Sequence, residues 1–527
     1  MRNFHHPGRS PSYSANGMVA TSHPIACKTA LMTLEKGGNA VDAAIAAALV
    51  LPICEPQMTG LYGDMFALIK HPRSKKIIGL NGSGKSPTLL NADWLRSRGQ
   101  TTILANSPHS ITLPGAIKAF ETLANDYSEL GLADACQSAI HYAEHGIPVA
   151  PRVAIDWQRS ADNLSNHAKS HYLINGAPPK VGQIFKSPLQ AEILRKIARF
   201  GSKGFYDGEV AADIITSLQN LGGMHTFDDL NNVASEYVTP ITADYKGSTL
   251  IELPPNGQGA TALLLAKILS HFDYTKMDPL GYERVHVEAE ASKLAYRARN
   301  RLIADTSYLK EEISTFFSDE SSLELAKLIN PRKASPSLDS QTEEVHLDTV
   351  LITVVDKNRC AVSLIFSIFH SFGSGHASEK YGLIFQNRGS GFTLEKGHPN
   401  ELQGGTRPLH TIIPARVEKN GELALIYGVM GGQYQPAGHV RVLSNMIDYG
   451  FDIQKAIDVP RSFPDSSGLL LEQGYNQKLI NQLQTMGHHV VRPDLPLGGA
   501  QGIVIDNDLG ILVGGSDPRK DGMAIGY

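Results

Sequence analysis

The feature that most constrains the fold is an abrupt change of pattern at residue 349. Residues 331–348 are rich in serine, proline and charge and have neither helical nor strand periodicity, which is typical of an exposed linker. Directly after them, two β-rich runs, Thr349–Val355 and Cys360–Ile368, flank the polar turn 356–359. This arrangement predicts a β-hairpin whose first strand begins at Thr349.

The chain on the two sides of this boundary has different patterns. Helical periodicity dominates residues 114–302, whereas short strands such as Leu423–Val429 follow residue 349, with helices between them. No period of about 20–50 residues repeats, which excludes solenoids and propellers. We therefore expect a helix-rich segment 1–348 that ends in the linker, and a sheet-rich segment 349–527.

Composition excludes several classes of protein. Of the 527 residues, 42% are hydrophobic and 19% are charged, as in soluble globular proteins, and the net charge of −4 does not fit a generally basic nucleic-acid binder. The four cysteines form no CxxC pair, so neither a zinc cluster nor a disulfide framework is expected. The longest apolar run, Ala43–Cys54, is shorter than the roughly 20 residues that cross a bilayer, and the amino terminus has no secretory h-region. We expect a cytoplasmic protein without a membrane partner.

Thr349 is the residue whose position most specifically suggests a chemical role. A threonine hydroxyl is a poor nucleophile unless a base accepts its proton. Cleavage of the chain just before Thr349 would free its α-amine, whose unperturbed pKa of roughly 7.7–8 suits a general base near neutral pH. The alternative is that Thr349 opens a strand through ordinary β propensity. The pattern alone leaves both interpretations open.

Two other patterns suggest binding sites. Residues 79–86 (GLNGSGKS) match the P-loop pattern formally, but Pro87 disfavours the helix that a P-loop lysine must begin, so a Gly-rich turn is the alternative. The histidine pairs His5-His6 and His488-His489 lack the i, i+4 spacing of helical metal ligands and are interpreted as solvated or capping residues. We expect no metal and no cofactor.

Several separated segments, taken together, resemble the γ-glutamyltransferase family. The resemblance runs from about residue 12 to residue 527, and its motifs occur in the family's order. The matching segments are Gly37–Ala44, Glu55-Pro56, Thr59–Asp64, Pro254–Gly259, Thr349–Gly375, Arg407–Thr411, Gly428–Gly432 and Gly515–Gly522.

The resemblance implies an α+β N-terminal-nucleophile hydrolase with a four-layer αββα sandwich, made as a proenzyme. Cleavage between Asp348 and Thr349 would give a large and a small subunit that stay associated, with Thr349 as the nucleophile. Family position assigns the oxyanion hole to the backbone N–H groups of Gly431 and Gly432, since glycine lets the backbone approach a substrate closely. Ser367 occupies the position of a hydroxyl residue near the nucleophile's amine. Its alternative is a polar residue on a hairpin face.

The chain departs from the family pattern where glutathione-cleaving members bind the glutamyl group. Ser83 replaces a carboxylate-binding arginine, and the residues that hold the α-amine are replaced by Phe369, Arg388 and Gly391. Further departures are His410 and Thr411 in place of paired serines, Val350 after the nucleophile, and Tyr62.

These substitutions resemble the subgroup that contains oxamate amidohydrolase and glutathione hydrolase-like proteins. They imply retained amide cleavage with weakened glutamyl recognition. The expected substrate is a small amide that carries a carboxylate, bound by Arg388 with His410, Thr411 and Phe369 nearby. A surface or intersubunit ion pair is the alternative for Arg388. A true glutathione hydrolase or transpeptidase, a P-loop nucleotide binder and an inactive binding relative remain as alternative functions.

Overall fold

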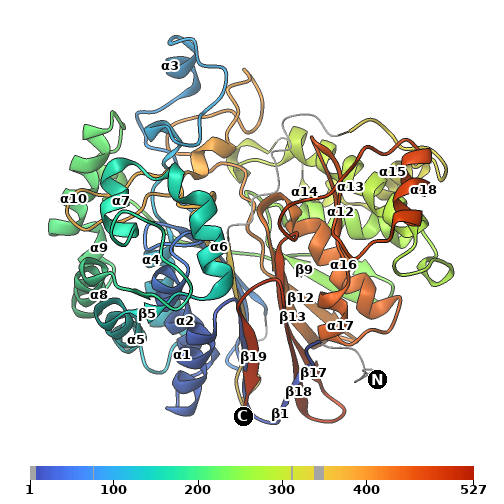
Figure 1. Ribbon diagram of the computed structural model, residues 1–527, viewed down its shortest axis with the longest axis horizontal. Helices are drawn as coiled ribbons and strands as arrows, with labels where there is room; N and C mark the ends of the chain where they lie inside the picture. The colour runs from blue at the N-terminus through green and yellow to red at the C-terminus, as the bar shows by residue number, and fades with distance from the viewer. Residues whose placement is uncertain (1–7, 75, 310–311, 338–348) are drawn as a thin grey trace.

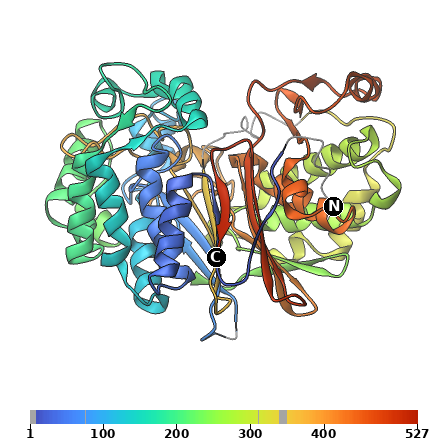
Figure 2. The same cartoon turned by 60° about the horizontal axis from the view of Figure 1, so that its bottom comes forward.

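Two seven-stranded sheets lie face to face and are covered on their outer faces by helices. The computed structural model describes residues 8–74, 76–309, 312–337 and 349–527. Figure 1 shows the helices of residues 24–220 on one side, the two sheets in the middle, and helices α12–α17 on the other side. The layers stay separate when the molecule is turned (Figure 2). The predicted four-layer αββα sandwich is thus confirmed.

The first sheet, sheet A, is antiparallel throughout, and its strands come from distant parts of the chain. In spatial order they are β1 (Ser12–Ser14), β18 (Ile511–Ser516), β17 (Gly499–Asp506), β13 (Glu422–Met430), β12 (Ala415–Lys419), β9 (Ser248–Glu252) and β8 (Ile241–Tyr245).

The second sheet, sheet B, has the predicted hairpin at its centre. Its order is β19 (Met523–Gly526), β2 (Met18–Thr21), β10 (Val350–Val355), β11 (Ala361–Ser367), β3 (Asp64–Lys70), β4 (Ile78–Gly82) and β7 (Glu236–Val238). Both hairpin strands are buried along their whole length, as expected for β-branched and aliphatic residues between two layers. Leu351 and Ile365 pack with Ile251 and Met430 of the facing sheet.

Each sheet combines strands from before and after residue 349. Sheet A takes β1, β8 and β9 from the earlier segment, and sheet B takes β10, β11 and β19 from the later one. The two segments therefore share one core instead of forming separate lobes. Such shared sheets would hold the two predicted subunits together after cleavage, because separating them would expose both buried faces to water.

The helices nearest the sheets pack directly on them, and the others pack on those helices. α2 is apolar on all sides and lies beneath β10 and β11, and its start is fixed by a capping box between Asn39 and Asp42, a device that contributes about 1 kcal/mol. On that side lie α1 (Pro24–Glu35), α2 (Ala40–Cys54), α4 (Ala116–Tyr127), α5 (Leu132–His145), α8 (Pro188–Phe200) and α10 (Gly208–Asn220). Opposite lie α12 (Gly259–Ser270), α13 (Tyr282–Leu302), α15 (Asp319–Lys327), α16 (Gln435–Ile447), α17 (Ile453–Asp458) and, further out, α18 (Gln477–Thr485).

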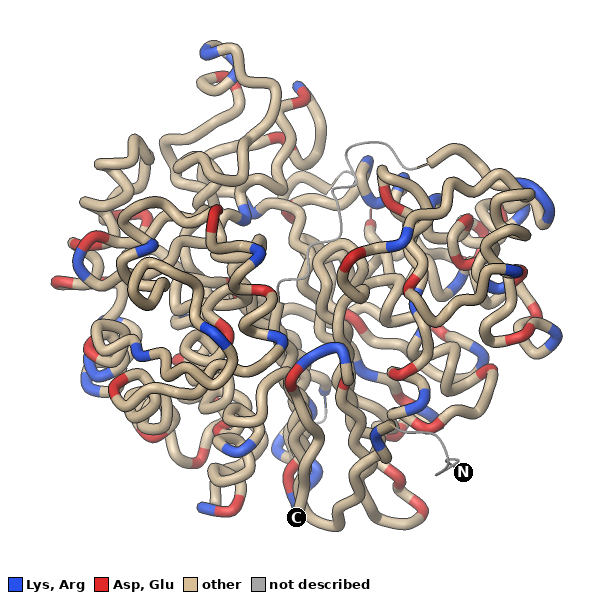
Figure 3. Tube along the Cα trace, in the orientation of Figure 1, with Lys and Arg blue, Asp and Glu red and all other residues tan. Residues whose placement is uncertain are grey.

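The surface carries both signs of charge. Figure 3 shows Lys and Arg interspersed with Asp and Glu over the described parts of the chain, in line with the small net charge of −4. Within the described residues, no helix combines the length and the apolar character needed to cross a membrane.

Candidate active site

Three polar side chains lie side by side at one end of sheet B. The pairing of Val350 with Phe366 puts Thr349, which precedes β10, next to Ser367 at the end of β11. Ser367 in turn pairs with Asp64, the first residue of β3. All three are buried. The strand register therefore brings a hydroxyl nucleophile candidate, a second hydroxyl and a carboxylate together from three parts of the sequence.

Ser367 connects the candidate nucleophile to a cation. The Thr349 hydroxyl donates to Ser367 Oγ at 3.4 Å, and Arg388 Nη2 donates to the same oxygen at 3.4 Å. The backbone N–H of Phe369 also donates to Ser367 Oγ, at 2.9 Å. These three contacts fix the Ser367 side chain beside Thr349.

Arg388 is buried inside the site, so a surface position for this residue is wrong. Its side chain is 0% exposed, and Nη1 donates to Thr411 Oγ1 at 2.8 Å. The guanidinium lies over the Phe369 ring at 4.0 Å from the ring centroid, a distance that allows a cation–π interaction. Phe369 has φ of +78°, and such strained backbone in a large residue is typical of functional sites.

His410 has an acidic partner. Its Nε2 lies 3.0 Å from Oδ2 of Asp64, and both side chains are 0% exposed. The other carboxylate oxygen of Asp64 accepts hydrogen bonds from Gly84 N, Gly115 N and Gln386 Nε2. Burial, reinforced by the positive charge of Arg388, lowers the pKa of His410 to about 4. His410 is therefore neutral at pH 7, with Nε2–H donating to Asp64.

This lowered pKa makes the protein less stable in mild acid. The unfolded chain takes up a proton on His410 near pH 6.5, whereas the folded chain does so near pH 4, so stability falls as the pH drops through this window. For one group the loss between pH 7 and pH 5 is about 2 kcal/mol. In urea titrations at both pH values, we expect His410→Asn to lose less stability over this interval than the wild type. An equal loss in both proteins would contradict the assignment of a neutral buried His410.

The predicted oxyanion residues form a tight turn between β13 and α16. Gly431 has φ of +125° and Gly432 has φ of +54°, both outside the region that ordinary side chains prefer. A Cβ on Gly431 would lie 2.8 Å from the Cα of Gly498. The N–H of Tyr434 donates to the Gly431 carbonyl at 3.0 Å and closes the turn.

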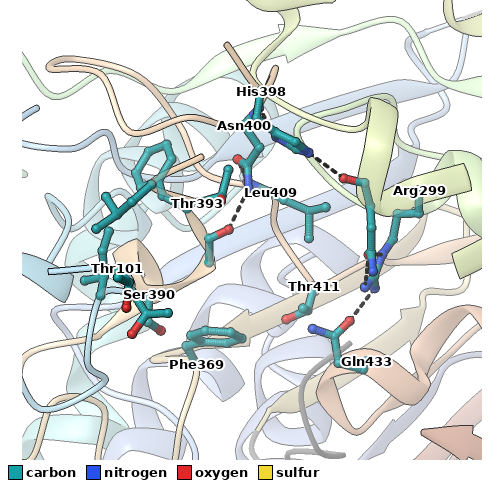
Figure 4. A pocket seen from close by; sticks show the side chains of 16 residues that line it. Thr101, Arg299, Phe369, Ser390, Thr393, His398, Asn400, Leu409, Thr411 and Gln433 are labelled. Atoms are coloured by element: carbon teal, nitrogen blue, oxygen red, sulfur yellow. Dashed lines mark hydrogen bonds between the residues drawn. The ribbon is translucent and has the colours of Figure 1, made fainter. Parts of the chain in front are cut away.

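A cavity of about 270 Å³ opens beside these groups. Phe369, Gly391, Thr411 and Gln433 line it, so it borders the oxyanion turn and the residues around Arg388. Figure 4 shows Phe369, Thr411 and Gln433 at one end of the cavity and His398 with Asn400 at the other. Apolar walls come from Ile103, Phe392, Leu394 and Leu409.

Other predicted positions have local roles. Ser83 Oγ donates to Asn81 Oδ1 at 2.7 Å. Val350 is a core residue of β10, and Tyr62 packs edge-on against Phe385 with ring centroids 4.9 Å apart. Asp348, on the other side of the predicted cleavage site, lies outside the described residues.

The P-loop alternative is not supported by the backbone. Residues 83–90, all of them described, contain no helix, and the next one, α3 (Ala92–Arg96), starts well after Lys85. The Leu113 N–H donates to the Lys85 carbonyl, and the Ser86 N–H donates to Thr406. The segment is therefore tied into neighbouring loops and cannot point its N–H groups at a phosphate as a P-loop does.

One further group of side chains has the composition of a metal site. His286, Glu290 and His488 are buried, and their ligand atoms lie within 4.8 Å of one another. His286 Nδ1 is already hydrogen-bonded to His488 Nε2 at 2.8 Å, and Lys293 Nζ lies 2.7 Å from Glu290. The Lys293 ammonium group neutralises the Glu290 carboxylate, and the two histidines already bind each other. These contacts favour a structural role for the group. The interpretation of His488 as solvated or capping is wrong, since His488 packs against α13; His5 and His6 lie outside the described residues.

The sequence patterns missed four residues that complete the site. Asp64 and Gln258 lie within the segments that resemble the family, whereas Arg299 and Gln433 lie outside them. Gln258 Nε2 donates to the carbonyls of Thr411 and Gly432, and Arg299 donates to Gln258. For Asp64, Gln258 and Gln433, a position in or next to a family motif was the available signal, but it gave no partner. Arg299 had no such signal.

Comparisons with known proteins agree with this geometry. The family model described as Gamma-glutamyltranspeptidase matches residues 26–527. The glutathione hydrolase-like YwrD proenzyme of Bacillus subtilis is 33% identical over 519 residues, covering 97% of this chain and 98% of that protein. The oxamate amidohydrolase proenzyme of Klebsiella pneumoniae is 31% identical over 534 residues, covering 98% and 100%.

Among solved structures, cephalosporin acylase from Bacillus halodurans has a TM-score of 0.92 and 34% identity, covering 100% of this chain and 99% of that one. The match thus extends over both sheets and both helical layers. The chain belongs to the γ-glutamyltransferase family, whose members are amide hydrolases and acyltransferases made as self-processing proenzymes.

Proposed function

We propose that this protein cuts its own chain between Asp348 and Thr349 and then hydrolyses a small amide that carries a carboxylate. The observation that carries the proposal is the contact of the buried Thr349 hydroxyl with Ser367, which also binds the buried Arg388. Thr349 stands at the start of a central strand, where cleavage frees an α-amine without removing any residue from the sheet.

The proposed amide hydrolysis needs only groups of the cleaved chain and water. The Thr349 hydroxyl attacks the amide carbon while its proton passes to the α-amine of the same residue. The carbonyl oxygen becomes an oxyanion that accepts from the N–H groups of Gly431 and Gly432. Collapse breaks the C–N bond, and the leaving amine takes the proton from the α-ammonium group. Water then attacks the ester with the amine as base, which releases the acid and restores the hydroxyl.

Arg388 supports the choice of a carboxylate-bearing substrate. Its guanidinium lies behind Phe369 and Thr411, two residues that line the cavity. A cation in a buried setting attracts an anion strongly, and it also favours the neutral, basic form of the nearby amine. The modest cavity and the name of the Klebsiella relative, oxamate amidohydrolase, favour a short acyl group.

A true glutathione hydrolase or transpeptidase is the second candidate, because several relatives are glutathione hydrolase proenzymes. Ser83 and Gly391 oppose it, since neither can bind the glutamyl carboxylate or ammonium group with a charge of its own. A panel of oxamate, succinamate and γ-glutamyl-4-nitroanilide separates the candidates. Faster turnover of the nitroanilide would favour the glutathione hydrolase, and no turnover of any would favour an inactive binding relative.

Replacing Arg388 with methionine is expected to remove the preference for a charged substrate. Succinamate and butyramide have the same chain length but differ in the carboxylate. The wild type should prefer succinamate by about 10²-fold in kcat/KM, because a charged hydrogen-bonded pair contributes about 1.5–3 kcal/mol, and Arg388→Met should lose most of this preference. Ammonia release measures both rates.

The matched control is Arg284→Met, which removes another fully buried arginine, on α13. This control should lower thermal stability and keep the substrate preference. A preference that survives in Arg388→Met would show that another group binds the carboxylate.

A further inference from the structure

The oxyanion turn is held from outside by a glutamine of the earlier segment. Gln258, from the loop before α12, is 0% exposed. Its amide nitrogen donates to the Gly432 carbonyl at 3.0 Å and to the Thr411 carbonyl at 2.7 Å. One side chain thus holds both the turn proposed to stabilise the oxyanion and the loop before β12 that carries Thr411.

Arg299 fixes the orientation of this glutamine. Its Nη1 donates to Gln258 Oε1 at 2.8 Å and also to Oε1 of Gln433, the residue after Gly432. Its Nε and Nη2 donate to Asn300 Oδ1 at 2.9 and 2.7 Å, which keeps the guanidinium in place on α13. If the Gln258 amide were flipped, its oxygen would face two carbonyl oxygens and its nitrogen would face a cation, so only the observed orientation is stable.

A pair of glycines needs such support. In a trans peptide the C=O of one residue and the N–H of the next point in opposite directions, so the bond from Tyr434 N to the Gly431 carbonyl sets the direction of the Gly432 N–H. The bond from Gln258 to the Gly432 carbonyl sets the following peptide plane. Both peptide planes that flank the flexible Gly432 are then fixed, which preorganises the Gly432 N–H for a developing negative charge.

We propose that Gln258 and Arg299 are positioning residues that align the oxyanion turn with the nucleophile. Both belong to the segment before residue 349, whereas the turn and the nucleophile belong to the segment after it. The inference rests on the proposed function. It implies that in the matured enzyme one subunit sets the catalytic geometry of the other.

The test is Gln258→Met, which keeps the length of the side chain and removes its hydrogen bonds. With the amide of the oxamate, succinamate and γ-glutamyl-4-nitroanilide panel that the wild type hydrolyses fastest, we expect kcat to fall about 10- to 100-fold. We expect KM and inhibition by the acid product to change by less than about threefold, because the turn acts on the transition state and not on substrate binding. Gln258→Glu should be at least as slow, since a carboxylate in this place repels the two carbonyls.

Gln190→Met is the matched control, since Gln190 is a buried glutamine on α8 that donates to Tyr172. It should lower the unfolding temperature and leave kcat unchanged. If Gln258→Met also lowers only the unfolding temperature, the positioning role is wrong while the proposed function stands. If the wild type hydrolyses none of the panel, the proposed function itself fails.

Discussion

Thr349→Ala is expected to leave the protein as a single 57.0 kDa polypeptide without amidase activity. The wild type should instead give fragments of 348 and 179 residues, about 38 and 19 kDa in proportion to length. Without the hydroxyl, nothing attacks the preceding carbonyl, and no terminal amine is formed to act as base. Because nucleophile and base are lost together, activity should fall by about 10⁴-fold or more.

Denaturing electrophoresis and intact-mass measurement check this result. Thr353→Ala is the matched control, because Thr353 is equally buried on β10, the strand that Thr349 precedes, and its hydroxyl donates to Ala20 O at 3.1 Å. This control should be cleaved and active. Thr349→Ser keeps a hydroxyl and should therefore still be cleaved, but more slowly than the wild type. A wild-type chain that stays whole and still hydrolyses amides would require a different nucleophile.

The fold could be predicted where local pattern and tertiary position agree. The hairpin strands match their predicted ranges closely, and helix α13 ends at residue 302, where the predicted helical stretch ends, because a continuous β-branched run and a long helical period leave few alternatives. Strands β8 and β9 were missed. They are short, β8 is half-exposed, and they lie in a stretch with helical patterns, so only the pairing of β9 with β12 and of β8 with β9 reveals them.

The contacts of the candidate site also fall into those that local sequence predicts and those that it does not. Thr349 and Ser367 meet because they face each other across one hairpin, so local sequence predicts their contact. Asp64 and His410 are 346 residues apart and meet only through the register of a third strand and the packing of a loop. The burial of Arg388 could not be predicted either, since an arginine is usually exposed unless its partners are known.

Gly431→Ala is expected to reduce kcat by about 10²–10³-fold in whatever protein still matures, the loss typical of one oxyanion donor. At φ of +125° an alanine is strained, and its Cβ would lie 2.8 Å from the Cα of Gly498. The backbone must therefore rotate or move, and either change turns the N–H groups of residues 431 and 432 away from the oxyanion. KM should change little, because a ground-state carbonyl accepts weaker hydrogen bonds than an oxyanion does.

Gly510→Ala separates this effect from the general cost of a side chain at positive φ. Gly510 has φ of +70°, in the turn before β18, and a Cβ there meets nothing within 4 Å. It should lose a little stability, about 1 kcal/mol, and keep full activity. Comparing kcat and unfolding temperature for both variants assigns the loss to the turn: if Gly431→Ala matches Gly510→Ala in turnover, the negative charge is stabilised elsewhere, and the role given to Gly431 and Gly432 is wrong.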